Sequence, residues 1–250
     1  MSSINELRRL RGAQRGARQQ NKAAFLFLLP WFVGLFGITL GPMLASLYLS
    51  FTKYNLLQPP RFSGLDNWTR MLSDERLHKS LQVTFTYVLV SVPLQLALAL
   101  ALALLLDRGM RGLSFYRSAF YLPSLIGGSV AIAVLWRTIF GTTGLVNKGL
   151  GIFGVHGQGW VSEPGTALST LIVLNVWTFG SPMVIFLAGL RQIPASFYEA
   201  ASVDGATRWR QFRSITVPML TPIIFFNLVL QIIHAFQTFT QAFVVSGGTG

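Results

Sequence analysis

Long apolar runs, separated by short polar segments, dominate the chain. A membrane-spanning helix needs about 20 mainly apolar residues. Five runs approach or exceed this length: Ala23–Phe51, Leu81–Leu106, Ser118–Trp136, Ala167–Leu190 and Ile215–Val245. The first and last are long enough to tilt or to extend past the bilayer. The pattern therefore predicts an all-α integral membrane protein built as a bundle of five transmembrane helices.

Composition supports a membrane protein and excludes several kinds of site. Of the 250 residues, 52% are hydrophobic and only 11% are charged, whereas soluble domains carry about 25% charged residues. The absence of cysteine excludes disulfides and cysteine-based metal sites. The formal charge of +12 does not indicate nucleic-acid binding, because basic and aromatic residues do not interleave as a stacking groove requires.

The distribution of lysine and arginine predicts the orientation in the membrane. Thirteen of them lie before the first run, between the second and third, or between the fourth and fifth, and six lie in the opposite segments. Loops rich in positive charge usually remain in the cytoplasm. We therefore expect a multi-pass protein with a cytoplasmic N-terminus.

The apolar cores hold no Asp, Glu, Lys or Arg, which is unlike the intramembrane charges of many proton- or ion-coupled transporters. The chain also lacks the G-x-x-x-x-G-K-[ST] loop that cradles nucleotide phosphates. Gly149, Gly151 and Gly154 fit G-x-G-x-x-G, but they follow no predicted strand, so a connector is the better interpretation. We expect neither an enzyme nor a nucleotide site in this chain.

Isolated polar residues in the rest of the chain point to no catalytic site. His78, His156 and His234 stand apart from any catalytic motif, and His234 could either line a pore or form a hydrogen bond between helices. Asn67 begins an N-x-[ST] pattern, which is common by chance.

A polar segment between the fourth and fifth runs has the signals of two short helices. Ser196 and Glu199 have capping-box spacing, which predicts a helix from Phe197 to Val203. Gly205 is suited to the left-handed turn that ends a helix, and Thr207 can cap a second helix that leads into the last run.

This elbow has features of a contact surface. Alanines at its centre would let another backbone approach closely, and large apolar side chains could anchor a partner: Ala200, Ala201, Tyr198, Val203, Trp209 and Phe212. An interfacial loop whose tryptophan and arginines lie among lipid headgroups remains an alternative.

The same segment resembles the EAA loop of permeases of binding-protein-dependent ABC importers. Glu199-Ala200-Ala201, then Gly205 and Ile215-Thr216-Val217-Pro218, follow the spacing E-A-A-x3-G-x9-I-x-L-P, with Val217 as the only departure. Further segments, including "GLDNWTRML" and "FLAGLRQIPASFYEAASVDGATRWRQFRSITVPMLTP", are similar to sugar-uptake permeases of the maltose and glycerol-3-phosphate type.

The resemblance implies a type I ABC importer permease (MetI-like) fold. It implies a basic cytoplasmic tail over residues 1–22, a first helix and external loop over 23–80, and the permease core over 81–250. Gly247-Gly248-Thr249 resembles a turn that precedes a sixth helix in this family, so the core is expected to be incomplete at its C-terminal end.

The resemblance also assigns roles. The helix docking on a cytoplasmic ATPase would hold Glu199, Ala200, Ala201, Asp204 and Gly205. The implied partners are a second homologous permease, an ABC ATPase dimer and an extracytoplasmic solute-binding protein, all at the cell (inner) membrane of a bacterium or archaeon. No cofactor is implied.

The transported solute would be a sugar or a related polyol or phosphate ester, because that is what the similar permeases import. Polar or aromatic residues of the fourth and fifth runs are candidates for lining its pathway: Asn175, Trp177, Asn227, Gln231, Gln237 and Gln241. Each could instead form an interhelical hydrogen bond, worth about 0.6 kcal/mol. A secondary transporter or channel without an ATPase is the alternative function.

Overall fold

The computed structural model describes residues 24–107, 109, 112–155 and 157–245. Over these residues the chain is mainly helical and divides into two units, residues 1–77 and 78–250. The described helices long and apolar enough to cross a membrane are Ala24–Ser50, Glu75–Asp107 and Arg208–Phe236, and two bent pairs raise the number to five if each pair is one span. The predicted basic tail, His156 and the Gly247–Thr249 turn lie outside the described residues.

The first unit contains the first predicted span as one continuous helix. Its middle is a π-helix, η1 (Gly34–Leu40), and its end is α2 (Gly41–Ser50). Pro42 follows the π-helix and lacks a backbone donor, which favours such a widened turn. Large side chains such as Phe27 and Ile38 are exposed, as expected for a helix that contacts lipid.

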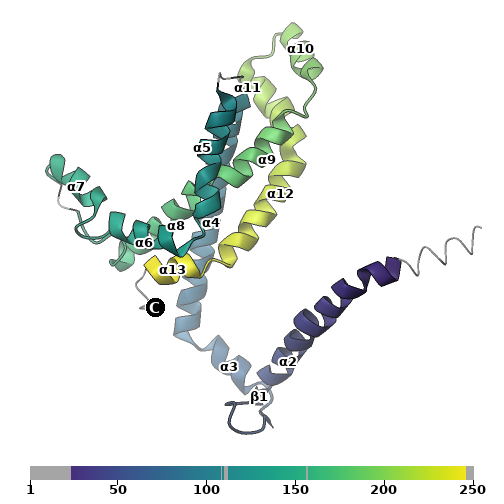
Figure 1. Ribbon diagram of the computed structural model, residues 1–250, viewed down its shortest axis with the longest axis vertical. Helices are drawn as coiled ribbons and strands as arrows, with labels where there is room; N and C mark the ends of the chain where they lie inside the picture. The colour runs from purple at the N-terminus through teal and green to yellow at the C-terminus, as the bar shows by residue number, and fades with distance from the viewer. Residues whose placement is uncertain (1–23, 108, 110–111, 156, 246–250) are drawn as a thin grey trace, which may run out of the picture. The chain divides into compact units, whose positions relative to one another are not determined.

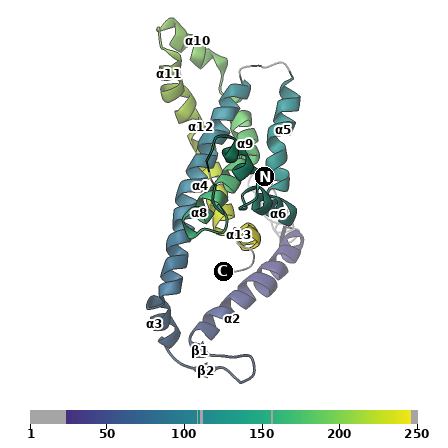
Figure 2. The same cartoon turned by 90° about the vertical axis from the view of Figure 1, so that its left-hand side faces the viewer.

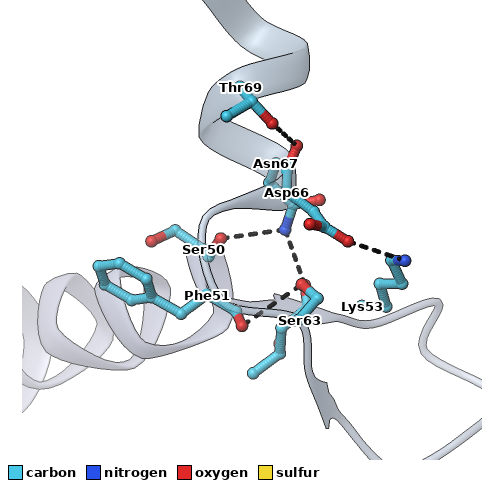
Figure 3. Close-up of polar contacts among 8 residues, drawn as sticks. Ser50, Phe51, Lys53, Ser63, Asp66, Asn67 and Thr69 are labelled. Carbon is cyan, nitrogen blue, oxygen red and sulfur yellow. Dashed lines mark hydrogen bonds and ion pairs between the residues drawn. The ribbon is translucent and has the colours of Figure 1, made fainter.

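Two short strands and a helix follow: β1 (Thr52–Lys53), β2 (Arg61–Phe62) and α3 (Asp66–Leu72). Asn67 ties these elements together, because its side-chain nitrogen donates to the carbonyl oxygens of Ser50 at 3.0 Å and Thr52 at 2.8 Å (Figure 3). Lys53 and Asp66 form an ion pair at 3.1 Å beside it. The amide of the N-x-[ST] pattern is thus engaged within the protein.

Helix α4 (Glu75–Asp107) contains the second predicted span. Its buried residues recur every three or four positions and so form one stripe: Tyr87, Val88, Ser91, Val92, Gln95, Leu96, Ala99, Ala103 and Leu106. Leu94, Leu98 and Leu105 are exposed on the rest of the helix. This division suits a helix with one face in the bundle and the other against lipid.

The third and fourth predicted spans are each broken, which corrects the expectation of continuous helices. The third consists of α5 (Leu113–Ile126) and α6 (Val130–Ile139), bent by 97°, and the fourth of α8 (Pro164–Trp177) and α9 (Gly180–Leu190), bent by 41°. Ser129 is the N-cap of α6, and its side-chain oxygen accepts a hydrogen bond from the Ile132 N–H. The G-x-G-x-x-G glycines lie in and just after α7 (Leu145–Ile152), which no described strand directly precedes.

The last predicted span also ends earlier than expected. After α10 (Ala195–Val203) and α11 (Arg208–Gln211), the chain passes through the π-helix η2 (Phe212–Thr216) into α12 (Val217–Phe236). Gln237 ends α12, and the separate helix α13 (Thr240–Val245) follows, so Ile215–Val245 is not one helix.

Within the second unit, α4, α5, α9 and α12 run along a common bundle (Figure 1, Figure 2). The elbow formed by α10 and α11 lies at one end of the bundle, and α6 and α13 lie toward the other. The core joins Leu96, Ala99 and Ala103 of α4 to Phe186 of α9 and Leu220 of α12.

Candidate functional site

The elbow between α9 and α12 matches the predicted pair of helices, with one correction. Helix α10 begins at Ala195 and its N-cap is Pro194, which is extended and makes no side-chain cap hydrogen bond. The predicted capping box of Ser196 and Glu199 is therefore wrong, because the helix starts two residues earlier, directly after Pro194, and Ser196 lies inside the first turn.

The turn within the elbow is confirmed. Gly205 has φ +73°, the left-handed conformation in which a glycine carries no steric penalty. Thr207 caps α11, where its side-chain oxygen accepts a hydrogen bond from the Arg210 N–H at 3.3 Å. The chain can therefore reverse between α10 and α11 within four residues.

The motif residues are accessible. Glu199, Ala200, Asp204 and Gly205 are exposed, and Ala201 is half-buried. Beyond them, the elbow presents three exposed apolar side chains, Val203 with 89% of its surface exposed, Trp209 with 69% and Phe197 with 49%. The elbow thus offers small residues flanked by apolar anchors, a combination suited to a protein contact.

Two of the expected anchors are only partly exposed, and one of them, Tyr198, packs against the core. Tyr198 is half-buried, and its hydroxyl lies 2.9 Å from the Thr216 hydroxyl of η2. Phe212 is also half-buried and stacks on Trp209, with ring centroids 5.5 Å apart. The sequence pattern lists apolar residues but gives no helix orientation, so it could not separate these from the outward-facing anchors.

Gln211, which the sequence did not single out, stabilises the elbow. The Gln211 side-chain nitrogen donates to the Ser202 hydroxyl at 3.0 Å and to the Ala206 carbonyl at 3.2 Å. Together with the contact between Tyr198 and Thr216, these bonds connect α10 to the segment that continues into α12.

A cavity of about 880 Å³ lies between this elbow and the bundle. Its lining combines apolar and polar side chains from α4, α9 and the elbow: Leu104, Asp107, Leu190, Tyr198, Arg208, Trp209, Gln211, Phe212 and Thr216. Asp107 also pairs with Arg191 at 3.7 Å, which joins the ends of α4 and α9. Both partners are well exposed, so this ion pair adds little stability.

A second, polar cavity of about 160 Å³ lies where the broken helices meet. Three of the predicted pathway residues share it, namely Asn175, Gln231 and Gln241, and His234 also lines it. The remaining lining residues are Tyr87, Ser124, Gly127, Gly128, Leu171, Leu174, Thr178 and Thr238. Five helices (α4, α5, α8, α12 and α13) and two helix breaks thus bring amides, hydroxyls and an imidazole together.

The other three pathway candidates lie outside this cavity. Trp177 packs against Trp136, with ring centroids 5.7 Å apart. Asn227 is fully buried, and neither its side-chain oxygen nor its nitrogen has a hydrogen-bond partner among the described residues. Gln237 is the exposed residue that ends α12.

Gln95 is a polar residue of the membrane region that sequence reasoning missed. It is 1% exposed, and its side chain bonds to Thr178 in the break of the fourth span. Its only sequence signal is a glutamine within an otherwise apolar run. Its partner is 83 residues away, so the role depends on tertiary structure.

The polar cavity suits an uncharged polar solute. Its described lining contains no Asp, Glu, Lys or Arg, whereas amides and hydroxyls both donate and accept hydrogen bonds. Among the described residues, no group of three or more His, Asp or Glu side chains is placed to hold a metal ion.

Comparisons with known proteins identify the family of this chain. Residues 68–250 match the family described as "Binding-protein-dependent transport system inner membrane component". The chain is 52% identical over 238 residues to the probable ABC transporter permease protein YesP of Bacillus subtilis (strain 168), with 94% of this chain and 77% of that protein covered. It is 33% identical over 231 residues to the lactose transport system permease protein LacF of Rhizobium radiobacter, with 90% and 76% covered.

A solved structure shows the same fold. A chain of the bacterial alginate ABC transporter, in complex with its alginate pentasaccharide-bound periplasmic protein, matches with a TM-score of 0.75 at 23% identity, covering 91% of this chain and 80% of that chain. The family resemblance inferred from the EAA spacing is confirmed. The chain belongs to the binding-protein-dependent transport-system inner membrane components, the permease subunits of ABC importers.

Proposed function

We propose that this permease carries a sugar across the membrane and that α10 is the helix on which a cytoplasmic ATPase docks. The observation that carries the docking assignment is the accessible Glu199–Gly205 segment on an elbow braced to α12. ATP-driven movement of the ATPase would displace α10, and the Tyr198 and Gln211 contacts would transmit the displacement to the membrane helices.

The proposed orientation puts the elbow and the N-terminus in the cytoplasm. This follows from the excess of lysine and arginine in the segments on that side. It also gives α10 access to an ATPase, which must meet cytoplasmic ATP. The permease core is proposed to begin near Leu81, after a first helix and loop over residues 23–80 and a basic tail over 1–22.

The complete transporter would contain a second homologous permease, two ATPase chains and an extracytoplasmic solute-binding protein. The permease itself would then need no nucleotide site, because energy reaches it through the contact at α10. The solute pathway would run between the two permeases, in the cell membrane of a bacterium or archaeon.

The sugar assignment is supported by the lining of the polar cavity. Asn175, Gln231 and Gln241 can bond several hydroxyl groups, and no charged side chain of the described lining selects for an ion. The relative LacF is named for lactose transport. A sugar is therefore the proposed solute.

A pair of charge substitutions tests the docking assignment. Glu199→Lys should release the ATPase from the purified complex and reduce uptake of labelled lactose, maltose or trehalose at least tenfold, while the amount of permease in the membrane is unchanged. Gln192→Lys introduces the same charge at an exposed position outside the motif and should leave both measurements unchanged. Full ATPase binding and uptake by Glu199→Lys would overturn the assignment.

The alternative, a channel or secondary transporter, makes the opposite prediction for energy use. Uptake into membrane vesicles should then continue when the ATPase is omitted. Under the proposed function it stops, because nothing displaces α10.

A further inference from the structure

The breaks in the two bent spans are in direct contact. Gly127 follows α5 at the first break, and Thr178 follows α8 at the second. A Cβ atom at Gly127 would collide with the Cγ2 of Thr178, so a glycine is needed there for the two breaks to meet. Gly180, at the start of α9, packs equally closely on the backbone of Phe120 in α5.

Thr178 is also the centre of a hydrogen-bond network. Its carbonyl oxygen accepts from the Gln95 side-chain nitrogen at 3.1 Å and from the Ser124 hydroxyl at 2.8 Å. Its hydroxyl accepts from the same Gln95 nitrogen at 3.0 Å and donates to the Asn175 carbonyl at 2.7 Å. The Ser124 hydroxyl in turn accepts from the Ser181 N–H at 2.9 Å.

These bonds satisfy the backbone where the helix is interrupted. A break inside an apolar span leaves carbonyl and N–H groups without their helical partners, and hydrocarbon supplies no replacement. Gln95 of α4 and Ser124 of α5 supply that replacement at the α8–α9 break. Through Thr178, the network therefore connects the second, third and fourth spans.

The network forms one wall of the polar cavity. Ser124, Gly127 and Thr178 line it directly. The Gln95 side-chain oxygen lies 3.5 Å from the side-chain nitrogen of Asn175, another lining residue. Gln95 therefore helps to fix the orientation of the Asn175 amide. The hydrogen-bonding groups that the cavity offers to a solute depend on that orientation.

Thr178 also lies at the far end of α9 from the elbow. Helix α9 begins two residues after Thr178 and ends at Leu190, five residues before α10. Its 11 residues span about 16 Å. A displacement of α10 would thus move α9 as a rigid helix, and Thr178, at the opposite end of α9, would move with it.

We propose that Ser124 and Thr178 lock the two helix breaks together, so that α5–α6 and α8–α9 move as one and the cavity keeps its shape, and that Gln95 is a positioning residue that holds this joint to α4. Gln95 need not touch the solute. The solute-related part of this inference rests on the proposed sugar transport, whereas the linkage between the breaks does not.

The absence of native cysteine allows a direct test of the linkage in the assembled transporter. One pair of spin labels at Phe115 and Val134 reports the α5–α6 bend, and another at Val173 and Val184 reports the α8–α9 bend. All four positions are exposed. Distances are measured in unsubstituted protein, in Ser124→Ala, which loses both hydrogen bonds between α5 and the α8–α9 break, and in Ser124→Thr, which keeps the hydroxyl.

Ser124→Ala should broaden or shift the distance distribution of both pairs, and Ser124→Thr should leave both as in the parent. A change confined to the α8–α9 pair, or no change in either, overturns the linkage. Gly127→Ala, whose Cβ would collide with the Thr178 side chain, should shift both distances as well, and this second variant decides the question if Ser124→Ala does not assemble.

Uptake kinetics then separate positioning from general stability. With labelled lactose, maltose or trehalose, whichever the parent complex imports, Gln95→Leu should raise the KM at least fivefold while the maximal rate per assembled complex changes less than twofold. A loss of maximal rate with an unchanged KM would contradict a positioning role. If no sugar is imported, the proposed solute class fails, but the spin-label result still decides whether the breaks are linked.

Discussion

The hydroxyl groups of Tyr198 in α10 and Thr216 in η2 lie 2.9 Å apart. This bond joins the exposed helix of the elbow to the buried start of the last long span, across 18 residues of sequence. Thr216 is only 5% exposed, so the bond ends in the core rather than on the surface.

Tyr198→Phe should therefore weaken the coupling of ATP hydrolysis to transport. A single hydrogen bond contributes about 1 kcal/mol, which corresponds to about a fivefold change in a rate or equilibrium. We expect uptake per ATP hydrolysed to fall by about this factor in reconstituted vesicles, without loss of folded protein, because the ring still fills its place.

Variants of Thr216 provide the control. Thr216→Ser keeps the hydroxyl and should behave like the parent, whereas Thr216→Val should resemble Tyr198→Phe. Combining Tyr198→Phe with Thr216→Val should cost no more than either change alone, since both remove the same bond. An additive loss would show that the two hydroxyls act separately.

Substitutions of Gly205 should disturb the turn through the backbone conformation that the new residue prefers, and not through the volume of its side chain. A Cβ added at Gly205 would meet no atom within 4 Å, so there is room for a side chain. The left-handed φ of +73° nevertheless costs most residues about 1–2 kcal/mol. Gly205→Val should reduce ATPase binding by about tenfold, measured by titration of the ATPase onto the purified permease.

Gly205→Asn is the matched comparison, because asparagine enters the left-handed region more readily than valine. It should retain most of the binding. Equal losses for the two variants would indicate that the partner needs the space itself and would contradict a conformational explanation.

The local features of the elbow could be predicted because they depend on a few adjacent residues. A glycine before a threonine cap, as at Gly205 and Thr207, defines a turn almost independently of its surroundings. The failed capping box shows the limit of this reasoning. Pro194 competes for the same helix start, and spacing alone does not show which residue prevails.

The broken spans and the polar cavity could not be predicted in the same way. Hydropathy averages over a window, so it remains high across Gly127 and Thr178 although the chain bends there. Each bend changes the direction in which later side chains point. Asn175 and Gln241 reach one cavity from two different helices, which only the tertiary structure shows, while Trp177 lies on another side of α8 from Asn175 and packs elsewhere.

Asn67 should hold the loop of the first unit in place through its two backbone acceptors, Ser50 and Thr52. Asn67→Ala removes both hydrogen bonds, worth about 2 kcal/mol together, so local opening should increase about 30-fold. Hydrogen exchange of the amides in residues 51–63 measures this opening.

Thr69→Ala distinguishes this structural role from glycosylation, since it also destroys the N-x-[ST] pattern but leaves the Asn67 bonds intact. Its own lost bond, from the Thr69 hydroxyl to the Asp66 carbonyl, is local and exposed. Protection of residues 51–63 should therefore remain within about twofold of the parent. Equal deprotection by both variants would contradict the role given to Asn67.

Asn227 is the polar residue of α12 that is hardest to explain by stability alone. It is fully buried, and both polar atoms of its side chain lack a partner among the described residues. Leaving a buried polar group unpaired costs about 1–3 kcal/mol. Asn227→Leu, which is similar in size and apolar, should therefore raise the thermal unfolding temperature of the purified permease in detergent.

Uptake by the same variant separates two explanations of why an asparagine stands there. If Asn227 serves the solute pathway, Asn227→Leu is more stable and yet imports less, because the amide is required only when solute or a moving helix reaches it. If Asn227→Leu instead lowers the unfolding temperature, the amide has a partner in the assembled permease and its role is structural. We expect the first outcome, since Gln231, one turn further along α12, already lines the polar cavity.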